Sequence, residues 1–231
     1  MRDTEFFQWL DSHQCSRTLY PMENLLSAAG GPERVAVLVV DLIKGFCNQG
    51  PLSSPMVGKL VQPTVAFLRR AHELGIRSYF FPCDAHPSDS PEFSAFPPHC
   101  VEGTTESEVV DEVASLEFAH LFRRIDKGSV CSLTGTGLVQ LLEEGEFTTL
   151  VCCGDCTDLC LYQMAVGLRF YANQHRIPWR IIVPQSLVAT YDLPVLTAQT
   201  VGALPHPSGL MNDIFLYHLE LNGVEVVADL R

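Results

Sequence analysis

The sequence predicts an α/β fold of three layers, in which helices cover both faces of a mainly parallel sheet of roughly six strands. Two observations lead to this prediction. Short segments made only of apolar residues, such as 35–40 (VAVLVV), are typical of strands buried on both faces of a parallel sheet. Between these segments, apolar residues recur every three or four positions, which is the spacing of amphipathic helices.

Length and composition favour one globular domain that carries an N-terminal extension. The chain has 231 residues, of which 47% are hydrophobic and 18% are charged, and this is enough to bury a full core. We assign residues 1–31 to an extension that packs on the core or on another subunit, which leaves a homo-oligomer open. Residues 32–231 form the single predicted domain.

Net charge and hydropathy limit the binding partners and the cellular location that we expect. The net charge of −12 disfavours nucleic acid and anionic membranes as partners. No segment reaches the roughly 18 apolar residues that a membrane span needs. The first residues carry acidic side chains and no continuous apolar run, so we expect no signal peptide and a cytoplasmic protein.

The nine cysteines are an odd number, which argues against a disulfide framework in such a protein. Cys153 and Cys156 form a CxxC pair and leave a redox motif open as an alternative. We expect no structural zinc site around this pair, because the sequence offers no second pair of ligands at a suitable spacing.

The elements follow one another in a regular order. The extension contains an amphipathic helix built on Phe6, Phe7, Trp9 and Leu10. After the strand 35–40 comes a helix between Leu60 and Ala71, which Gly75 ends and in which Pro63 marks a kink or a late start. The second strand is 76–82, and the polar, proline-rich segment 83–107 is long enough to be functional. The remaining predictions are a short helix at 106–114, a strand at 120–125, a helix at 134–142, strands at 149–153 and 179–183 with a helix between them, a helix at 212–222 and a strand at 224–228.

Cys160 is the first candidate for a nucleophile. Gly154 interrupts the apolar run 149–153, and Thr157 is a good residue to cap a helix N-terminus. Cys160 then falls in the first turn of the helix, where the helix dipole and free backbone N–H groups favour the reactive thiolate. The same N–H groups could hold an oxyanion.

Asp41 and Lys127 follow the predicted strands 35–40 and 120–125, as Cys160 follows 149–153. Each has a structural alternative: a strand-end aspartate often caps a loop, a lysine beside an aspartate is usually solvated, and a cysteine at a helix start is often packed. Ligands of parallel sheets, however, bind at the carboxyl ends of the strands. A carboxylate base, a cation and a thiol together are what nucleophilic attack on a carbonyl requires.

A second group of polar residues lies in and after the second strand. Asp84 and His86 are two positions apart at a strand end and point to the same side, while Glu92 and His99 follow downstream. An aspartate with two histidines is a plausible open metal site. The alternative is a polar loop whose histidines are solvated.

Five motifs in order resemble the nicotinamidase branch of the isochorismatase-like cysteine hydrolases. They are DLIKGF at 41–46, DAH at 84–86, FPPHC at 96–100 with Gly103-Thr104 after it, DKGS at 126–129 and GDCTDLC at 154–160. The resemblance covers about residues 34–230. It implies the isochorismatase-like fold and a catalytic triad of Cys160, Asp41 and Lys127.

The resemblance also implies a divalent metal on Asp84, His86 and His99, with Glu92 as a further ligand, directly or through water. We expect zinc, with iron or manganese as alternatives. It implies that Phe46 and Phe96 flank the substrate ring. It further implies a cis peptide bond between Asp155 and Cys156, and an oxyanion hole formed by the N–H groups of Cys156 and Cys160.

The activity implied is hydrolysis of a small molecule, nicotinamide, to nicotinic acid and ammonia through a cysteine thioester, a step of NAD salvage. One alternative is another small-amide hydrolase of the same superfamily. Isochorismate hydrolysis has little use for this cysteine or for the metal, and a non-catalytic metal-binding module has little use for the triad. The chain departs from the family pattern at Asp155, where an apolar residue is usual, at Met164, where threonine is common, and in its N-terminal extension.

Overall fold

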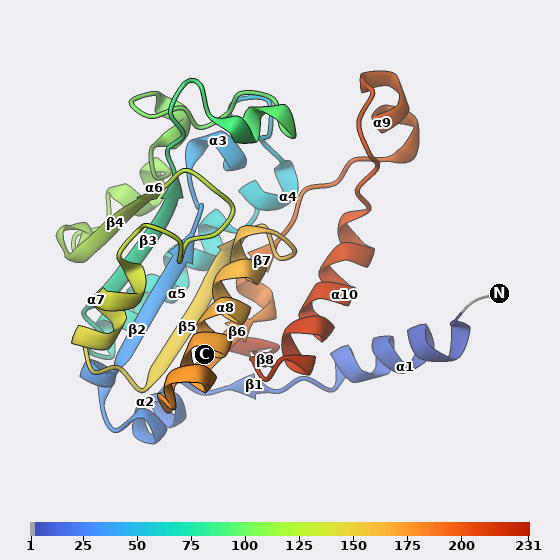
Figure 1. Cartoon of the computed structure of the whole chain (residues 1–231). Coiled ribbons are helices and arrows are strands. Elements are labelled where there is room, and N and C mark those ends of the chain that lie inside the picture. The colour runs from blue at the N-terminus through green and yellow to red at the C-terminus, as the bar shows by residue number, and fades with distance from the viewer. Residues whose placement is uncertain (1–2) are drawn as a thin grey trace.

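The computed structural model describes residues 3–231 and is built around one parallel sheet (Figure 1). The strand order is β4-β3-β2-β5-β6-β8, and the short β7 pairs with β5. The strands of this sheet are β2 (Val35–Val40), β3 (Ser78–Asp84), β4 (Phe122–Lys127), β5 (Thr149–Asp155), β6 (Arg180–Pro184), β7 (Val188–Ala189) and β8 (Glu225–Val227). The predicted fold class is confirmed, with β7 as a seventh strand.

Helices cover both faces of the sheet. In Figure 1, α7 and α8 lie in front of the sheet and α5 lies behind it. Buried residues of α2 join the core cluster on the α5 side, and those of α10 join the cluster on the α8 side. The α-helices are α1 (Thr4–Cys15), α2 (Met22–Ala29), α3 (Lys44–Cys47), α4 (Pro55–Gly58), α5 (Val61–Glu73), α6 (Asp111–Ala114), α7 (Leu138–Glu144), α8 (Cys160–His175), α9 (Val195–Val201) and α10 (Ser208–Leu221). Within residues 3–231, none of these helices has both the length and the apolar character needed to cross a bilayer.

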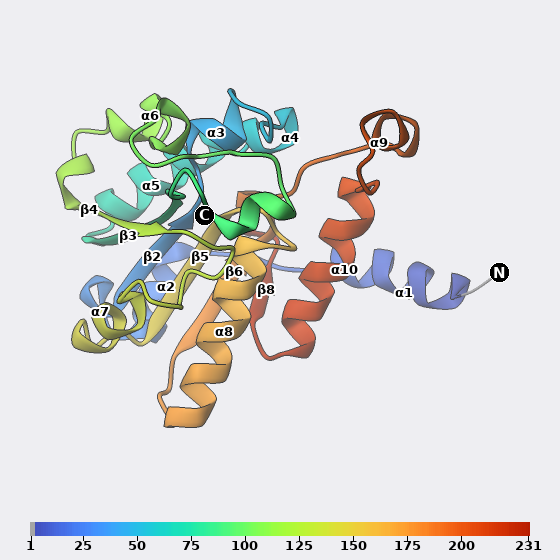
Figure 2. The same cartoon turned by 45° about the horizontal axis from the view of Figure 1, so that its top comes forward.

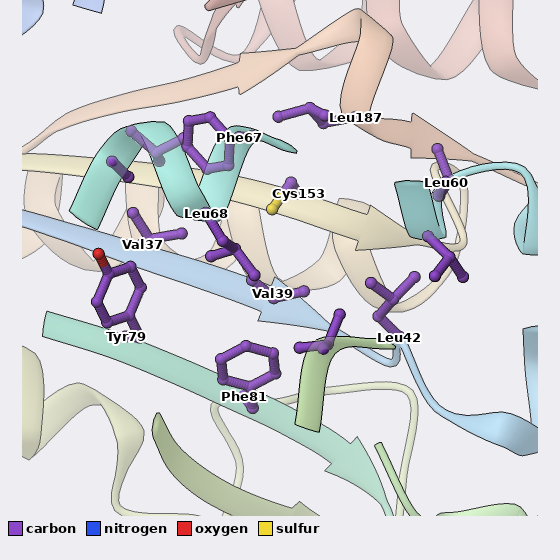
Figure 3. Packing of buried hydrophobic residues seen from close by; sticks show 14 of the residues in the cluster. Val37, Val39, Leu42, Leu60, Phe67, Leu68, Tyr79, Phe81, Cys153 and Leu187 are labelled. Atoms are coloured by element: carbon purple, nitrogen blue, oxygen red, sulfur yellow. The ribbon is translucent and has the colours of Figure 1, made fainter. Parts of the chain in front are cut away.

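The alternation of side chains along β2 divides the core into two clusters. All six residues of β2 are buried. Val37 and Val39 face the α5 side, where Figure 3 shows them packed near Leu68 and Phe81. Leu38 and its alternate neighbours face α7 and α8 instead. Apolar side chains on both faces explain why this strand is a continuous apolar run.

Several predicted boundaries are shifted or wrong. The strands predicted at 76–82 and 120–125 each begin and end two residues later, at 78–84 and 122–127, so that Asp84 and Lys127 become the last residues of adjacent strands. The helix predicted at 106–114 is wrong: the chain forms a 3-10 turn and then only the four-residue α6.

The N-terminal segment is attached at three places. The predicted amphipathic helix is α1, whose Phe6 and Trp9 rings contact Tyr217 of α10. The two-residue strands β1 (Leu19–Tyr20) and β9 (Asp229–Leu230) pair in parallel. Helix α2 contributes buried side chains to the core. In Figure 2, α1 extends away from the sheet beside α10. The division of the chain at residue 31 stays a prediction.

Candidate active site

Polar side chains from neighbouring strands meet at the carboxyl end of the sheet. Asp41 follows β2, Asp84 ends β3, Lys127 ends β4, and Cys160 begins α8 directly after β5. Side-chain ligand atoms of Asp41, Asp84 and Cys160 all lie within 4.8 Å of one another. The parallel order β4-β3-β2-β5 places these strand ends side by side, although they are distant in the sequence.

Lys127 is the centre of this group, and its side chain is not exposed to solvent. Its ammonium Nζ lies 2.7 Å from Asp41 Oδ2 and 3.4 Å from Cys160 Sγ, and it donates a hydrogen bond to Asp84 Oδ1. Burial alone would lower the pKa of Lys127, but Asp41, Cys160 and Asp84 together hold that pKa well above its usual value. The lysine is therefore a buried cation, and the solvated alternative is wrong.

Asp41 is fully buried and adopts a left-handed backbone conformation, with φ of 54°. Its Oδ1 accepts a hydrogen bond from the backbone N–H of Asp84 at 2.8 Å. Burial, followed by the negative charge of Asp84, raises the pKa of Asp41 to about 6, while Lys127 and Cys160 oppose the rise. A carboxylate with a pKa close to the working pH can both take up and release a proton.

Cys160 is the first residue of α8, and Leu159 occupies the N-cap position without a capping side chain. The predicted cap at Thr157 is wrong, because the N-cap position lies two residues later and the Thr157 hydroxyl has no hydrogen-bond partner among the described residues. Burial raises the pKa of the Cys160 thiol well above its usual value, although Lys127 opposes the rise. Burial and the neighbouring carboxylates thus oppose the thiolate that the helix N-terminus is expected to favour. The thiol needs a proton acceptor, and Asp41 is within reach.

The turn between β5 and α8 leaves backbone donors free. The peptide bond between Asp155 and Cys156 is cis, as the resemblance implied. Across residues 3–231, no backbone acceptor forms a hydrogen bond with the N–H group of Cys156 or of Cys160. Two unpaired donors beside a thiol are what an oxyanion hole requires.

Asp84 also faces a second group of side chains through its other oxygen. Asp84 Oδ2 lies 3.5 Å from His86 Nε2 and 3.8 Å from His99 Nε2, and His86 Nε2 lies 4.0 Å from Glu92 Oε1. Ligands about 2.0–2.2 Å from a tetrahedral ion lie roughly 3.3–3.6 Å from one another. The Asp84 oxygen therefore lies at nearly this spacing from both histidine nitrogens, and all three atoms lie within 4.8 Å of one another.

The hydrogen-bonding state of the two histidines also fits a metal site. His99 Nδ1 donates to the carbonyl of Pro97 at 2.8 Å, which leaves the Nε2 lone pair directed at the group. Neither ring nitrogen of the fully buried His86 has a hydrogen-bond partner among the described residues. A buried imidazole without a partner is unfavourable unless a ligand satisfies it. These residues fit a divalent metal.

A cavity with about 320 Å³ of empty space, its open mouth included, connects the two groups. Its wall combines polar site residues with apolar side chains; the lining residues are Asp41, Phe46, Leu52, Asp84, Glu92, Phe96, His99, Val130, Asp155, Cys156, Leu159 and Cys160. Phe46 and Phe96 both approach His99, with ring centroids 5.7 Å and 6.1 Å away. The cavity thus has an aromatic wall beside His99.

Sequence reasoning missed two features of this site. It assigned Asp84 to the metal group alone, whereas the carboxylate also pairs with Lys127; this pairing follows from the register of β3 and β4, for which the sequence carries no signal. It also missed His206, whose Nε2 lies 2.7 Å from Asp158 Oδ2 in the turn before α8. The ring of His206 stacks on Tyr191 at 3.9 Å, and no local pattern in the sequence indicates this contact.

The parallel α/β sheet, with a buried thiol, carboxylate and ammonium at the carboxyl ends of its strands, is the arrangement expected of an isochorismatase-like hydrolase. The chain belongs to the isochorismatase family: the family model for the isochorismatase domain matches residues 35–171. Nicotinamidase 1 of Arabidopsis thaliana is 32% identical over 211 residues, which cover 84% of this chain and 85% of the relative. These matches confirm the resemblance that the five motifs indicated.

Solved structures share the fold. A pyrazinamidase/nicotinamidase from Streptococcus mutans UA159 matches with a TM-score of 0.68 and 23% identity over 84% of this chain and 99% of that chain. A pyrazinamidase of Pyrococcus horikoshii, solved in complex with zinc, matches with a TM-score of 0.65 and 20% identity over 84% of this chain and 98% of that chain.

Proposed function

We propose that the protein is a nicotinamidase, an amidohydrolase that converts nicotinamide to nicotinic acid and ammonia, a reaction of NAD salvage. The observation that carries this proposal is the contact of one buried ammonium, Lys127, with Asp41, Asp84 and Cys160. The similarity to Nicotinamidase 1 of Arabidopsis thaliana over most of both chains supports the choice of substrate.

The chain's own residues account for the chemical steps. Asp41 takes the proton of the Cys160 thiol, and Lys127 stabilises the resulting thiolate through the 3.4 Å contact between Nζ and Sγ. The sulfur attacks the carboxamide carbon, and the N–H groups of Cys156 and Cys160 hold the oxyanion. Asp41 returns its proton to the departing ammonia, and water activated by Asp41 then hydrolyses the thioester.

Asp84, His86 and His99 would hold a divalent metal, with Glu92 as a further ligand directly or through water. Two imidazoles and carboxylate oxygens are ligands that suit zinc, and iron or manganese are the alternatives. When bound, the metal would orient the substrate by accepting the lone pair of its ring nitrogen. Phe46 and Phe96 would contact the faces of the ring and keep it in line with the thiol.

The proposal is tested by incubating the metal-loaded protein with nicotinamide and measuring ammonia and nicotinic acid together. We expect equal amounts of both products from the wild-type protein and none above background from Cys160→Ala. Circular dichroism should give the same spectrum for both proteins. Turnover of other small amides but not of nicotinamide would favour the alternative amidase, and full activity of Cys160→Ala would refute the nucleophile.

A further inference from the structure

Asp155 is a buried carboxyl in the cavity that the proposed reaction does not use. It is the last residue of β5 and has no exposed surface, yet it lines the cavity together with Phe46 and Leu52. The carboxyl is therefore part of the same cavity wall as Phe46 of α3.

One oxygen of this carboxyl has no partner. Oδ2 accepts a weak hydrogen bond from the Cys156 thiol at 3.8 Å, but Oδ1 has no hydrogen-bond partner among residues 3–231. The nearby cation does not serve it, because Lys127 pairs with Asp41 and Asp84 instead. Buried polar groups in folded proteins nearly always find a partner, so a partner for Oδ1 has to come from what fills the cavity.

The surroundings of this carboxyl influence its protonation state. Burial, and then the charges of Asp41 and Asp84, raise the pKa of Asp155 well above its usual value, whereas Lys127 and Cys156 lower it less. Burial thus favours the protonated form of this carboxyl. Such a group offers one O–H donor and one carbonyl acceptor, and so it can bind a hydroxyl, an amino group or a ring nitrogen.

We propose that Asp155 forms a hydrogen-bonding subsite of the cavity that selects aromatic carboxamides bearing a further polar group on the ring. This inference rests on the proposed function, since the thiol of Cys160 fixes one end of the substrate at its carboxamide. A ring with only C–H groups facing Asp155 would leave Oδ1 buried and unpaired. A ring with a hydroxyl, amino or nitrogen there satisfies it, and sites built in this way discriminate strongly against analogues that lack the group.

The test compares kcat/KM for nicotinamide, for pyrazinamide and for nicotinamides that carry a hydroxyl or amino group at each free ring carbon. In the wild-type protein, at least one substituted amide should exceed nicotinamide by about tenfold, the effect of one well-placed hydrogen bond. Asp155→Leu should abolish this preference, and Asp155→Asn, which keeps one donor and one acceptor, should retain most of it. Asp11→Leu, a change of the same kind on the exposed surface of α1, should leave the ratio unchanged.

Dissociation constants of the same amides for Cys160→Ala and for Cys160→Ala with Asp155→Leu provide a readout without turnover. If Asp155→Leu does not fold, Asp155→Ala takes its place. The inference is overturned if no substituted amide is preferred by the wild-type protein, or if the Asp155 variants lower kcat/KM for all amides by one common factor. Absence of turnover for every amide would refute the proposed function instead, and the dissociation constants would still test the subsite.

Discussion

Asp41 should determine how the activity depends on pH. Its pKa of about 6 means that roughly one-tenth of the carboxyl groups are ionised at pH 5 and nearly all at pH 8. Because the base must be ionised to take the thiol proton, kcat/KM should rise about tenfold from pH 5 to a plateau above pH 7. Asp41→Asn should lower the plateau by about 10²–10⁴-fold, the usual contribution of a general base.

The same pKa shift makes a prediction for stability. A rise from 3.8 to about 6 corresponds to roughly 3 kcal/mol in favour of the neutral carboxyl in the folded protein. Since the folded pKa lies above the unfolded one, this contribution is complete below about pH 4 and is lost as the pH rises through 6. The free energy of unfolding of the wild type minus that of Asp41→Asn should therefore fall over this interval, by about 3 kcal/mol.

Both quantities can be measured on the same proteins. Initial rates of ammonia release give kcat/KM from pH 5 to 8, with the metal content determined at each pH so that loss of metal is not mistaken for titration of the base. Asp126→Asn, an exposed carboxyl next to Lys127, is the matched control and should keep the wild-type profile. A flat wild-type profile at constant metal content, or wild-type activity in Asp41→Asn, would refute the assignment of the base.

Three further predictions concern the groups around this base. Lys127→Met leaves the Asp41 and Asp84 carboxylates buried without a cation, so urea denaturation should show a loss of about 3–5 kcal/mol; a loss below about 1 kcal/mol would contradict the buried ion pairs. Removal of divalent metal by chelation should lower kcat/KM for nicotinamide, and zinc should restore it; unchanged activity of protein shown to be metal-free would contradict the metal assignment. His206→Ala removes the contact to Asp158 and should lower the free energy of unfolding by about 1.5–3 kcal/mol; an unchanged midpoint would show that the contact is not stabilising.

The sequence predicts those parts of the fold whose pattern is local. β2 and the first part of β5 are recognisable because both faces of each strand are buried and every residue there is apolar or small. β4 lies at the edge of the sheet and keeps both arginines and Asp126 exposed, so its pattern is weak and its boundary was misplaced. The predicted helix at 106–114 failed because the segment has no apolar stripe long enough to pack.

The candidate site, like the fold, is predictable where the pattern is local. Short motifs identify the side chains, and the rule for strand ends indicates that Asp41, Lys127 and Cys160 meet. The pairing of Asp84 with Lys127 depends on the register between β3 and β4, which the sequence does not reveal. The free oxygen of Asp155 is also hidden, because only the packed structure determines whether a buried carboxyl finds a partner.

The roles proposed for the triad depend on a thioester between Cys160 and the acyl part of the substrate. Hydroxylamine, added to the wild-type protein during turnover of nicotinamide, should intercept this thioester and yield the hydroxamate of nicotinic acid at the expense of nicotinic acid, while Cys160→Ala should yield neither product. Ammonia release without hydroxamate at any hydroxylamine concentration, or hydroxamate formation by Cys160→Ala, would contradict the covalent mechanism.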